Sequence, residues 1–441
     1  MPSANQPKNG ITKLTNCRLG RGDSLVFDNI WISSKTGKIL RSQAAFYDEL
    51  ILPDEIIDLG GRIVSPGFIE CQLNGAFGFN FSTVMDDMSQ YGKKVRDLNK
   101  KLVQTGVTSY IPTVTSQASD LYKKVLPYLG PSGNSPIANE GAESLGAHVE
   151  GPFLNPGKNG VHNKTALREA ETVLDLDEMY GASNINPSAT EGRIPIKMMT
   201  AAPELGQMIK IIPELRSRGI IYSIGHSEAT FEEASAAVAA GATMITHLFN
   251  AMRPLHHRNP GIFGVLGIAD SSLPRRPFFG IIADGIHLHP ATIKIAWNAH
   301  PDGFILVTDA MHMAGLPDGT YPWTNGEGEH FITKKGPVLL LQGSDTIAGS
   351  SITLIDCVNN FLNWSGATIP QALKAVTATP ALMLGVEDAK GSLEAGADAD
   401  LVILSEEKSD SGWTSLVVDE VWKFGSKVFE RDNLIGLSVI S

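Results

Sequence analysis

The stretch FILVTDAM (residues 304–311) is an apolar run that ends on a carboxylate, Asp309. An ionised aspartate is costly to remove from water, so packing alone does not account for one at the end of a buried strand. In barrels of parallel strands, however, the chemistry gathers at the carboxyl ends of the strands. Asp309 is therefore a candidate functional residue, and its partners are expected at the ends of other strands.

Seven further apolar runs of strand length precede this one, and helix signals separate several of them. Among these signals are the capping box of Thr230 and Glu233 and a helix start at Pro290. Eight strands alternating with helices over about 250 residues fit a (β/α)8 barrel of the TIM type. A doubly wound open sheet is the competing architecture, and the lack of a G-x-G-x-x-G after the first strand weakens it. The eight runs are SPGFIEC, VTSYIPT, SLGAHVE, IKMMTAA, IIYSIGH, ATMITHL, FFGIIAD and FILVTDA.

Both ends of the sequence contain short strand-like segments with turn residues between them. SLVFDNIWIS (24–33) and VVDEVWKFGSKVFE (417–430) are examples, and Gly425-Ser426 suits a two-residue hairpin loop. We expect one small β-sandwich domain built from both termini, with the barrel inserted between its halves. The expected limits are 1–64 and 386–441 for the small domain and 65–385 for the barrel.

The composition of the 441 residues, 42% hydrophobic and 19% charged, is that of a globular protein. The net charge of −11 argues against a general nucleic-acid or anionic-membrane surface, but it leaves room for one basic pocket. Cys17, Cys71 and Cys357 lie far apart and form no C-x-x-C, which favours a reducing compartment. With no signal peptide or membrane-length apolar segment, a cytoplasmic protein is expected.

Polar side chains follow nearly every predicted strand. Glu150, His226 and His247 supply a carboxylate and two imidazoles, a set that leaves one coordination position open on a hydrolytic divalent metal. Taken singly, each of these residues is more often a hydrogen-bonded structural group or a helix cap. The barrel brings their strand ends together with that of Asp309. Other polar groups at strand ends are Gln72, Asn74, Thr113, Glu204, Asp284 and His287.

Several longer motifs resemble those of the N-acetylglucosamine-6-phosphate deacetylases, a family of the amidohydrolase superfamily. The resemblance runs in order from VSPGFIECQLNG (64–75) to GSLEAGADADLVIL (391–404). Many superfamily members carry H-x-H on the first strand and a bridging lysine on the fourth. Here Gln72 and Asn74 replace the histidines and the fourth strand ends without lysine, so one metal ion is expected. The other motifs are HVEGPFLNPGKNGVHN, SIGHSEA, THLFNAM, HHRNPGIFG, IIADGIHLHP, LVTDAMHMAG and TIAGSSIT.

The resemblance implies hydrolysis of N-acetyl-D-glucosamine 6-phosphate to D-glucosamine 6-phosphate and acetate, in amino-sugar breakdown. It implies that Glu150, His226 and His247 hold one divalent ion, with zinc expected and iron or cobalt as alternatives. Asp309 would take a proton from the metal-activated water and return it to the departing amine, although a role as a further metal ligand is the alternative. His162 would stabilise the oxyanion, whereas its loop position alone suggests an ordinary surface histidine.

By the same resemblance, Arg258 grips the phosphate of the substrate bound by a neighbouring subunit, which implies a homodimer. A solvated loop charge is the alternative for Arg258, and a contact at a helix start is the alternative for His287. The remaining substrate contacts that the resemblance implies are Val161, Asn250, Ala251, His287, Ile347, Ala348 and Gly349. Neither the sequence nor the resemblance assigns a role to His256, His257, His289 or His312.

Two other functions compete with the deacetylase. One is hydrolysis of another amide, such as an N-acyl amino acid or a cyclic amide, which Arg258 and the HLFNAM segment disfavour. The other is a barrel that has lost catalysis and serves as an interaction scaffold, although such proteins usually lose their ligands. The stretches 128–143 and 172–195 match none of the motifs and are interpreted as surface loops.

Overall fold

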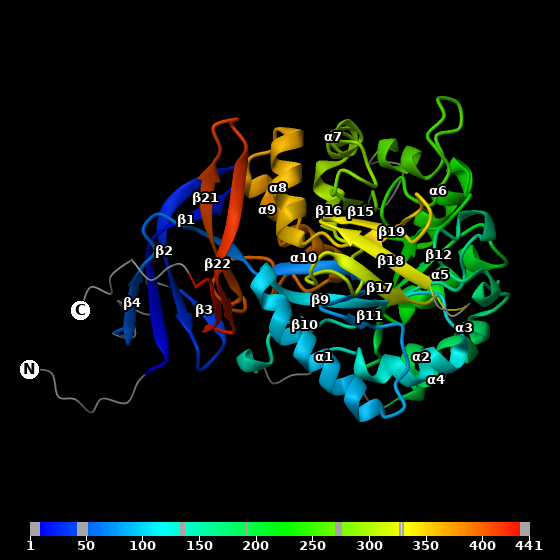
Figure 1. Cartoon of the computed structure of the whole chain (residues 1–441), viewed down its shortest axis with the longest axis horizontal. Coiled ribbons are helices and arrows are strands. Elements are labelled where there is room, and N and C mark those ends of the chain that lie inside the picture. The colour runs from blue at the N-terminus through cyan, green and yellow to red at the C-terminus, as the bar shows by residue number, and fades with distance from the viewer. Residues whose placement is uncertain are drawn as a thin grey trace, which may run out of the picture.

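The structure is a computed structural model that describes residues 9–41, 52–132, 137–190, 193–269, 276–325, 328 and 330–432. It contains a barrel of parallel strands surrounded by helices and, beside the barrel, a separate sheet in which the blue and red ends of the chain meet (Figure 1). The predicted fold class, a (β/α)8 barrel with a small β domain from both termini, is confirmed. The exact domain limits remain a prediction.

Eight parallel strands form the barrel, and they pair in the order in which they occur along the chain. Every one of the eight apolar runs predicted as a strand supplies one of them. Their side chains are almost entirely buried, because one face fills the barrel and the other packs against helices. The strands are β6 (Phe68–Leu73), β9 (Val107–Val114), β11 (Ala147–Glu150), β12 (Ile196–Ala201), β13 (Ile221–Ile224), β14 (Met244–Ile245), β15 (Phe278–Ile282) and β16 (Phe304–Val307).

The barrel closes unevenly between its first strand, β6, and its last, β16. Toward the amino ends, the backbone of residues 375–376 lies between the two strands and accepts hydrogen bonds of 2.8 Å from β6 and 3.1 Å from β16. Toward the carboxyl ends the two strands meet directly. There Asp309 N–H donates to the carbonyl of Gln72 at 2.9 Å, and Asn74 N–H donates to that of Ala310 at 2.9 Å. The seam is therefore held by direct pairing only next to the rim.

The helices lie outside the barrel, as the alternating pattern predicts (Figure 1). The predicted capping box forms at the start of α6, where Glu233 N–H donates to Thr230 Oγ1 and Thr230 N–H donates to the Glu233 carboxylate. The interpretation of 172–195 as a surface loop is wrong, because this stretch contains α3 and α4 and buries Leu176 and Tyr180. The helices are α1 (Met88–Leu102), α2 (Ser119–Val125), α3 (Val173–Tyr180), α4 (Ala182–Ile185), α5 (Met208–Ser217), α6 (Phe231–Ala240), α7 (Pro290–Ala299), α8 (Leu354–Ser365), α9 (Ile369–Lys374) and α10 (Ala378–Leu384).

Among the described residues, no helix has the length and apolar character needed to cross a membrane.

The small domain is one eight-stranded sheet to which both termini contribute. Its strand order is β23-β22-β21-β5-β1-β2-β3, and β4 pairs with β1 as well. The antiparallel pair of β5 and β21 joins the two halves of the domain. The hairpin loop is Phe424-Gly425, one residue before the predicted Gly425-Ser426, and both residues have positive φ angles (46° and 73°). The strands are β1 (Ile11–Arg21), β2 (Ser24–Ser33), β3 (Lys38–Leu40), β4 (Glu55–Asp58), β5 (Ile63–Pro66), β21 (Leu401–Lys408), β22 (Thr414–Lys423) and β23 (Ser426–Glu430).

A four-stranded antiparallel sheet interrupts the barrel pattern between β16 and α8. It is the yellow sheet in Figure 1, which lies over one end of the barrel. The sequence pattern did not predict it, because its strands are short and only partly buried and so lack a continuous apolar run. Its strands are β17 (Gly319–Trp323), β18 (His330–Lys335), β19 (Val338–Leu341) and β20 (Ile347–Ser350).

A buried cluster of charges joins the small domain to the barrel. The Lys423 ammonium lies 2.6 Å from a carboxylate oxygen of Asp400 and 2.6 Å from one of Glu143, which belongs to the barrel. Lys390 also contacts Asp400, at 2.7 Å. Burial by itself would raise the pKa of Asp400, but the two ammonium groups outweigh it and lower the pKa to about 2.

We expect Asp400→Asn to destabilise the protein by about 3–5 kcal/mol, because it removes from the buried cluster the carboxylate that Lys390 and Lys423 share. The folded-state pKa of Asp400 lies below its unfolded value, so the stabilisation is present above about pH 4 and is lost as the pH falls toward 2. Denaturant unfolding as a function of pH measures this loss in the wild type, and Asp400→Asn should lack it. Asp97→Asn, which removes an exposed carboxylate, is the control. An acid dependence identical in Asp400→Asn and the wild type would contradict the prediction.

Candidate active site

A cavity of about 360 Å³ opens at the carboxyl ends of the barrel strands. All the site residues predicted from the sequence line it, except Arg258. Glu150 ends β11, and the others come from loops that follow five of the eight strands and from the antiparallel sheet, so only the folded barrel brings them together. The predicted residues in the cavity are Glu150, Val161, His162, His226, His247, Asn250, Ala251, His287, Asp309, Ile347, Ala348 and Gly349.

Three electron-rich atoms converge at the floor of this cavity. The Nε2 atoms of His226 and His247 lie 3.0 Å apart, and Glu150 Oε1 lies 3.3 Å from the first and 3.1 Å from the second. His226 Nδ1 lies 2.7 Å from the carbonyl oxygen of Lys158, which can only accept a hydrogen bond. His226 therefore carries its proton on Nδ1 and turns the lone pair of Nε2 toward the other two atoms. This is the tautomer that a metal ligand requires.

The charges around these atoms favour a cation between them. Burial would raise the pKa of Glu150, but the adjacent imidazoles of His226 and His247 outweigh it and hold the pKa well below its usual range. Burial would likewise lower the pKa of His247, yet the Glu150 carboxylate raises it. Glu150 thus stays ionised, and His247 carries positive charge more readily. Both effects favour a cation at this point in the cavity.

The three atoms also have the spacing of metal ligands. Ligands at zinc distances of about 2.0–2.1 Å in a tetrahedron are ~3.3 Å apart, close to the separations of 3.0–3.3 Å found here. The set of one carboxylate and two imidazoles suits zinc, iron or cobalt. The residues present therefore fit a divalent metal ion, and Glu150, His226 and His247 form a cluster able to hold one.

The backbone is strained at three residues of the site. His226, His247 and Asp309 have φ angles of 49°, 26° and 49°, a left-handed region that side chains with a Cβ avoid. Such conformations cost on the order of 1–3 kcal/mol each and persist only where the surroundings impose them. The strain turns each side chain away from the strand direction and into the cavity, which places it at a functional site and not at an ordinary strand end.

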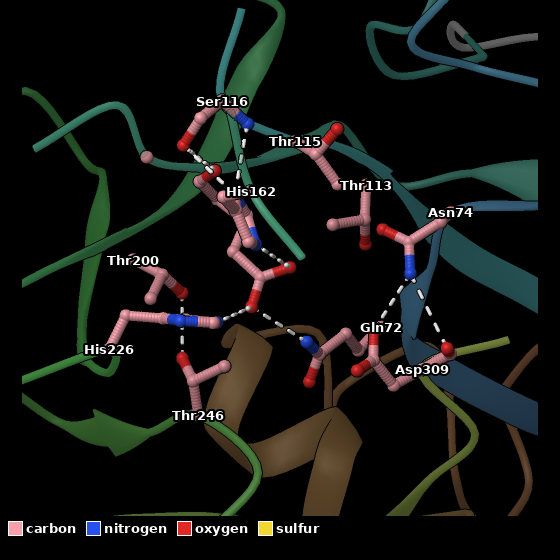
Figure 2. Close-up of polar contacts among 12 residues, drawn as sticks. Gln72, Asn74, Thr113, Thr115, Ser116, His162, Thr200, His226, Thr246 and Asp309 are labelled. Carbon is pink, nitrogen blue, oxygen red and sulfur yellow. Dashed lines mark hydrogen bonds and ion pairs between the residues drawn. The ribbon is translucent and has the colours of Figure 1, made fainter. Parts of the chain in front are cut away.

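Gln72 and Asn74, which stand where many superfamily members have histidines, use their amide groups as donors. Gln72 Nε2 donates to Glu150 Oε1 at 3.0 Å, and Asn74 Nδ2 donates to Asp309 Oδ1 at 2.7 Å. Figure 2 shows Asn74 beside Asp309, across the site from His162 and Ser116. Both amides thus orient carboxylates, which is consistent with a single metal site.

Asp309 lies on the opposite side of the cavity from His162, and burial raises its pKa to about 6, with a further contribution from the negative charge of Glu150. A carboxyl group in this range can take up and release a proton near neutral pH. His247 and the hydrogen bond from Asn74 oppose the increase.

His162 faces the same cavity as a neutral donor. The backbone N–H of Ser116 donates to His162 Nδ1 at 3.2 Å, so the proton of the ring is on Nε2. That nitrogen lies 3.9 Å from Glu150 Oε2, and burial lowers the pKa of His162 to about 3. The alternative of an ordinary surface histidine is wrong, because the residue is 7% exposed.

The structure gives the other predicted residues less direct roles. Arg258 lies in an exposed loop outside its own cavity, with its guanidinium 3.0 Å from His257 Nε2. His287 Nδ1 contacts Asp284 Oδ2 at 2.6 Å, which fixes the ring at the cavity wall. Of the unassigned histidines, His289 caps α7 by accepting from Ala291 N–H.

Sequence reasoning missed several residues of the site. Ser116 lies two residues beyond β9. At this strand end the sequence pattern indicated Thr113 instead, whose hydroxyl accepts a structural hydrogen bond from Leu73 N–H. The carbonyl of Lys158 leaves no trace in a side-chain pattern. Residues of the unpredicted antiparallel sheet and its loops were also missed; those in the cavity wall are Trp323, Thr324, Asn325 and Thr346.

The chain belongs to the amidohydrolase family, whose sequence model matches residues 63–428. Members of this family are in general metal-dependent, in agreement with the cluster of Glu150, His226 and His247.

More specific similarity is found with one group of deacetylases. The chain is 40% identical to "N-acetylglucosamine-6-phosphate deacetylase" of Danio rerio, over 96% of this chain and 97% of the relative, and 39% identical to the protein of the same name from Homo sapiens, over 96% of each. The crystal structure of N-acetylglucosamine-6-phosphate deacetylase from Thermotoga maritima matches with a TM-score of 0.73 at 27% identity, covering 95% of this chain and all of that one. A mutant of the Mycobacterium smegmatis enzyme, in complex with N-acetyl-D-glucosamine-6-phosphate, matches with a TM-score of 0.74 at 25% identity over 96% of this chain and all of that one.

We expect Glu150→Gln to weaken divalent-metal binding by at least the ~10–100-fold that loss of an outer-shell partner costs, because it removes one of three ligands and its charge. Metal content after dialysis and titration calorimetry with Zn²⁺ measure the change. Glu204→Gln is the matched control. Glu204 is a carboxylate at the same rim, but it is engaged with Ser227 Oγ and the N–H of Glu228 and does not line the cavity. Equal metal content in wild type and Glu150→Gln would contradict this assignment.

Proposed function

We propose that this protein hydrolyses N-acetyl-D-glucosamine 6-phosphate to D-glucosamine 6-phosphate and acetate, as a cytoplasmic enzyme of amino-sugar breakdown. One observation carries the proposal. The three converging atoms of Glu150, His226 and His247, the proton carrier Asp309 and the neutral donor His162 share one cavity. The relatives bearing the deacetylase name align with 96% of the chain.

One divalent ion per subunit would be held by Glu150, His226 and His247, with zinc as the first choice and iron or cobalt as alternatives. When bound, such an ion polarises the amide carbonyl and makes a water molecule more acidic at neutral pH. Gln72 and the Lys158 carbonyl fix the orientation of two of the three ligands.

Asp309 acts as general base and then as general acid. Its raised pKa, about 6, allows it to accept the proton of the attacking water and to hold it until the C–N bond breaks. It then gives this proton to the sugar nitrogen, because an amine leaves readily only when protonated. Asn74 keeps the carboxylate turned toward the cavity throughout.

His162 supplies the hydrogen bond that the developing oxyanion needs. Its Nε2–H is held in place by the Ser116 N–H on the far side of the ring, so it costs no reorganisation when negative charge develops on the acetyl oxygen. Because the pKa of His162 lies far below neutral pH, the ring stays a neutral donor and does not compete with Asp309 for the proton.

The sugar phosphate is bound between two subunits of a homodimer. The family resemblance assigns Arg258 to the phosphate in the active site of the neighbouring subunit, and its place in an exposed loop outside its own cavity is compatible with that role. His287 and the backbone of the 250–251 and 347–349 segments line the cavity wall and bind the rest of the sugar, together with the backbone of Val161.

Acetate release tests the proposed substrate. The wild type should release acetate from N-acetyl-D-glucosamine 6-phosphate much faster than from the unphosphorylated sugar, and a chelator should abolish the activity. Arg258→Ala should raise KM for the phosphorylated sugar while barely affecting the slow reaction of the other, because it removes a guanidinium–phosphate contact. Equal effects on both sugars would reject the anchoring role, and activity that survives chelation would reject the metal.

Asp309→Asn should lower kcat by about 10²–10⁴, the usual contribution of general acid–base catalysis. Its metal content should equal that of the wild type, since Asp309 is not one of the three converging groups. Steady-state kinetics together with metal analysis measures both quantities. Retention of nearly normal kcat would exclude Asp309 as the base, and loss of metal would make it a ligand instead.

A further inference from the structure

Glu70 is a buried acid that the proposed mechanism does not use. It lies on β6, is 1% exposed, and points away from the active-site cavity toward the seam between β6 and β16. Its Oε1 atom accepts two backbone hydrogen bonds, from Gln72 N–H at 3.0 Å and from Thr308 N–H at 3.3 Å. One side chain thus joins the first strand of the barrel to the segment that follows the last one.

The position of this contact explains why a carboxyl group is present. Toward the amino ends of the strands, residues 375–376 separate β6 from β16, whereas near the rim the two strands pair directly through Gln72 and Asp309. Thr308 lies between these two regions, and its N–H donates to Glu70 instead of to a backbone carbonyl of β6. Without Glu70, the N–H groups of Gln72 and Thr308 would be buried with no acceptor, which proteins rarely tolerate.

The two residues that Glu70 holds are neighbours of the proposed catalytic machinery. Thr308 immediately precedes Asp309, whose φ angle of 49° must be imposed by its surroundings. Gln72 contributes both the carbonyl that accepts from Asp309 N–H and the amide that donates to Glu150. A single carboxyl oxygen therefore fixes the turn that aims Asp309 and the strand end that supports the ligand Glu150.

We propose that Glu70 is a positioning residue for the deacetylation reaction, which sets the orientation of Asp309 through the backbone of Thr308 and Gln72. This inference rests on the role of Asp309 as the base. Burial raises the pKa of Glu70 to about 8, so its carboxyl group is neutral at neutral pH, and glutamine reproduces both its shape and its charge. An adjoining cavity of about 190 Å³, lined mostly by apolar side chains, gives other substituents room at this position.

Four variants test the proposal by separating kcat from KM. Glu70→Gln keeps an oxygen that accepts both N–H groups, so its kcat should stay within about threefold of the wild type. Glu70→Leu removes the acceptor and should lower kcat by ~10–100-fold, the scale of a small misplacement of a catalytic group. KM should change less than about twofold, since the substrate contacts lie on other strands, and metal content at saturating Zn²⁺ should equal that of the wild type, since all three ligands are retained. Glu70→Asp is shorter by one methylene, which withdraws the acceptor from the two N–H groups, so its kcat should fall as in Glu70→Leu. Because it keeps a polar group, it provides an impaired variant that folds. Asp400→Asn, destabilised far from the site, should keep its kcat.

Each result has one meaning. Low kcat with unchanged KM in Glu70→Leu or Glu70→Asp, together with rescue in Glu70→Gln, supports the inference. Normal kcat in Glu70→Leu and Glu70→Asp overturns it, and so does a loss of kcat in Glu70→Gln that equals the loss in Glu70→Leu. It is also overturned if Asp400→Asn, at the same loss of melting temperature, loses as much kcat as the impaired Glu70 variants. If Asp309→Asn stays active, the role of the base and this inference both fail. If Asp309→Asn is inactive while the Glu70 variants are normal, only the inference fails.

Discussion

The rest of the site depends on one unfavourable arrangement: three electron-rich atoms held within 3.0–3.3 Å of one another in a buried place. Two imidazole lone pairs and a carboxylate oxygen repel one another unless positive charge lies between them. The parallel strands impose the arrangement, because β11, β13 and β14 end at the same rim, where Glu150 ends β11 and a histidine lies two residues beyond each of the other two strands. Lys158, through its carbonyl, and Gln72 then limit how far two of these groups can rotate.

The same arrangement separates the candidate functions. His226, His247 and Asp309 have strained φ angles. Strained backbone persists only where the surroundings impose it, and a protein that serves only as an interaction scaffold would not need it at these three positions. An enzyme for another amide would need the same hydrolytic groups but not an arginine that binds a phosphate. The relatives include an N-acetylgalactosamine-6-phosphate deacetylase from Escherichia coli O157:H7, 31% identical over 84% of this chain.

The barrel and the composition of its rim could be predicted because each depends on a local pattern. Apolar runs of strand length gave all eight strands, and a polar residue just past a run located Glu150, His226, His247 and Asp309. The resemblance was needed for His162, which lies in a loop without periodicity. What escaped prediction depends on tertiary contacts. The antiparallel sheet has half-buried strands with no clear alternation, and Ser116 and Glu70 act through backbone groups of residues distant in the sequence. Likewise, helices α3 and α4 occupy a stretch whose Ser-, Asn- and Glu-rich composition is typical of loops.

The construction of the small domain from both termini has a consequence during synthesis on the ribosome. Strand β5 lies between β1 and β21, and residues 67–400 separate β5 from β21 along the chain. At roughly 5–20 residues per second, a nascent chain carries the unpaired edge of β5 for on the order of 20–60 seconds before its partner emerges. The barrel also waits, because its seam requires residues 375–376. The small domain therefore cannot complete its sheet until β21 has been synthesised, and an open strand edge of this kind is a template for association with other chains.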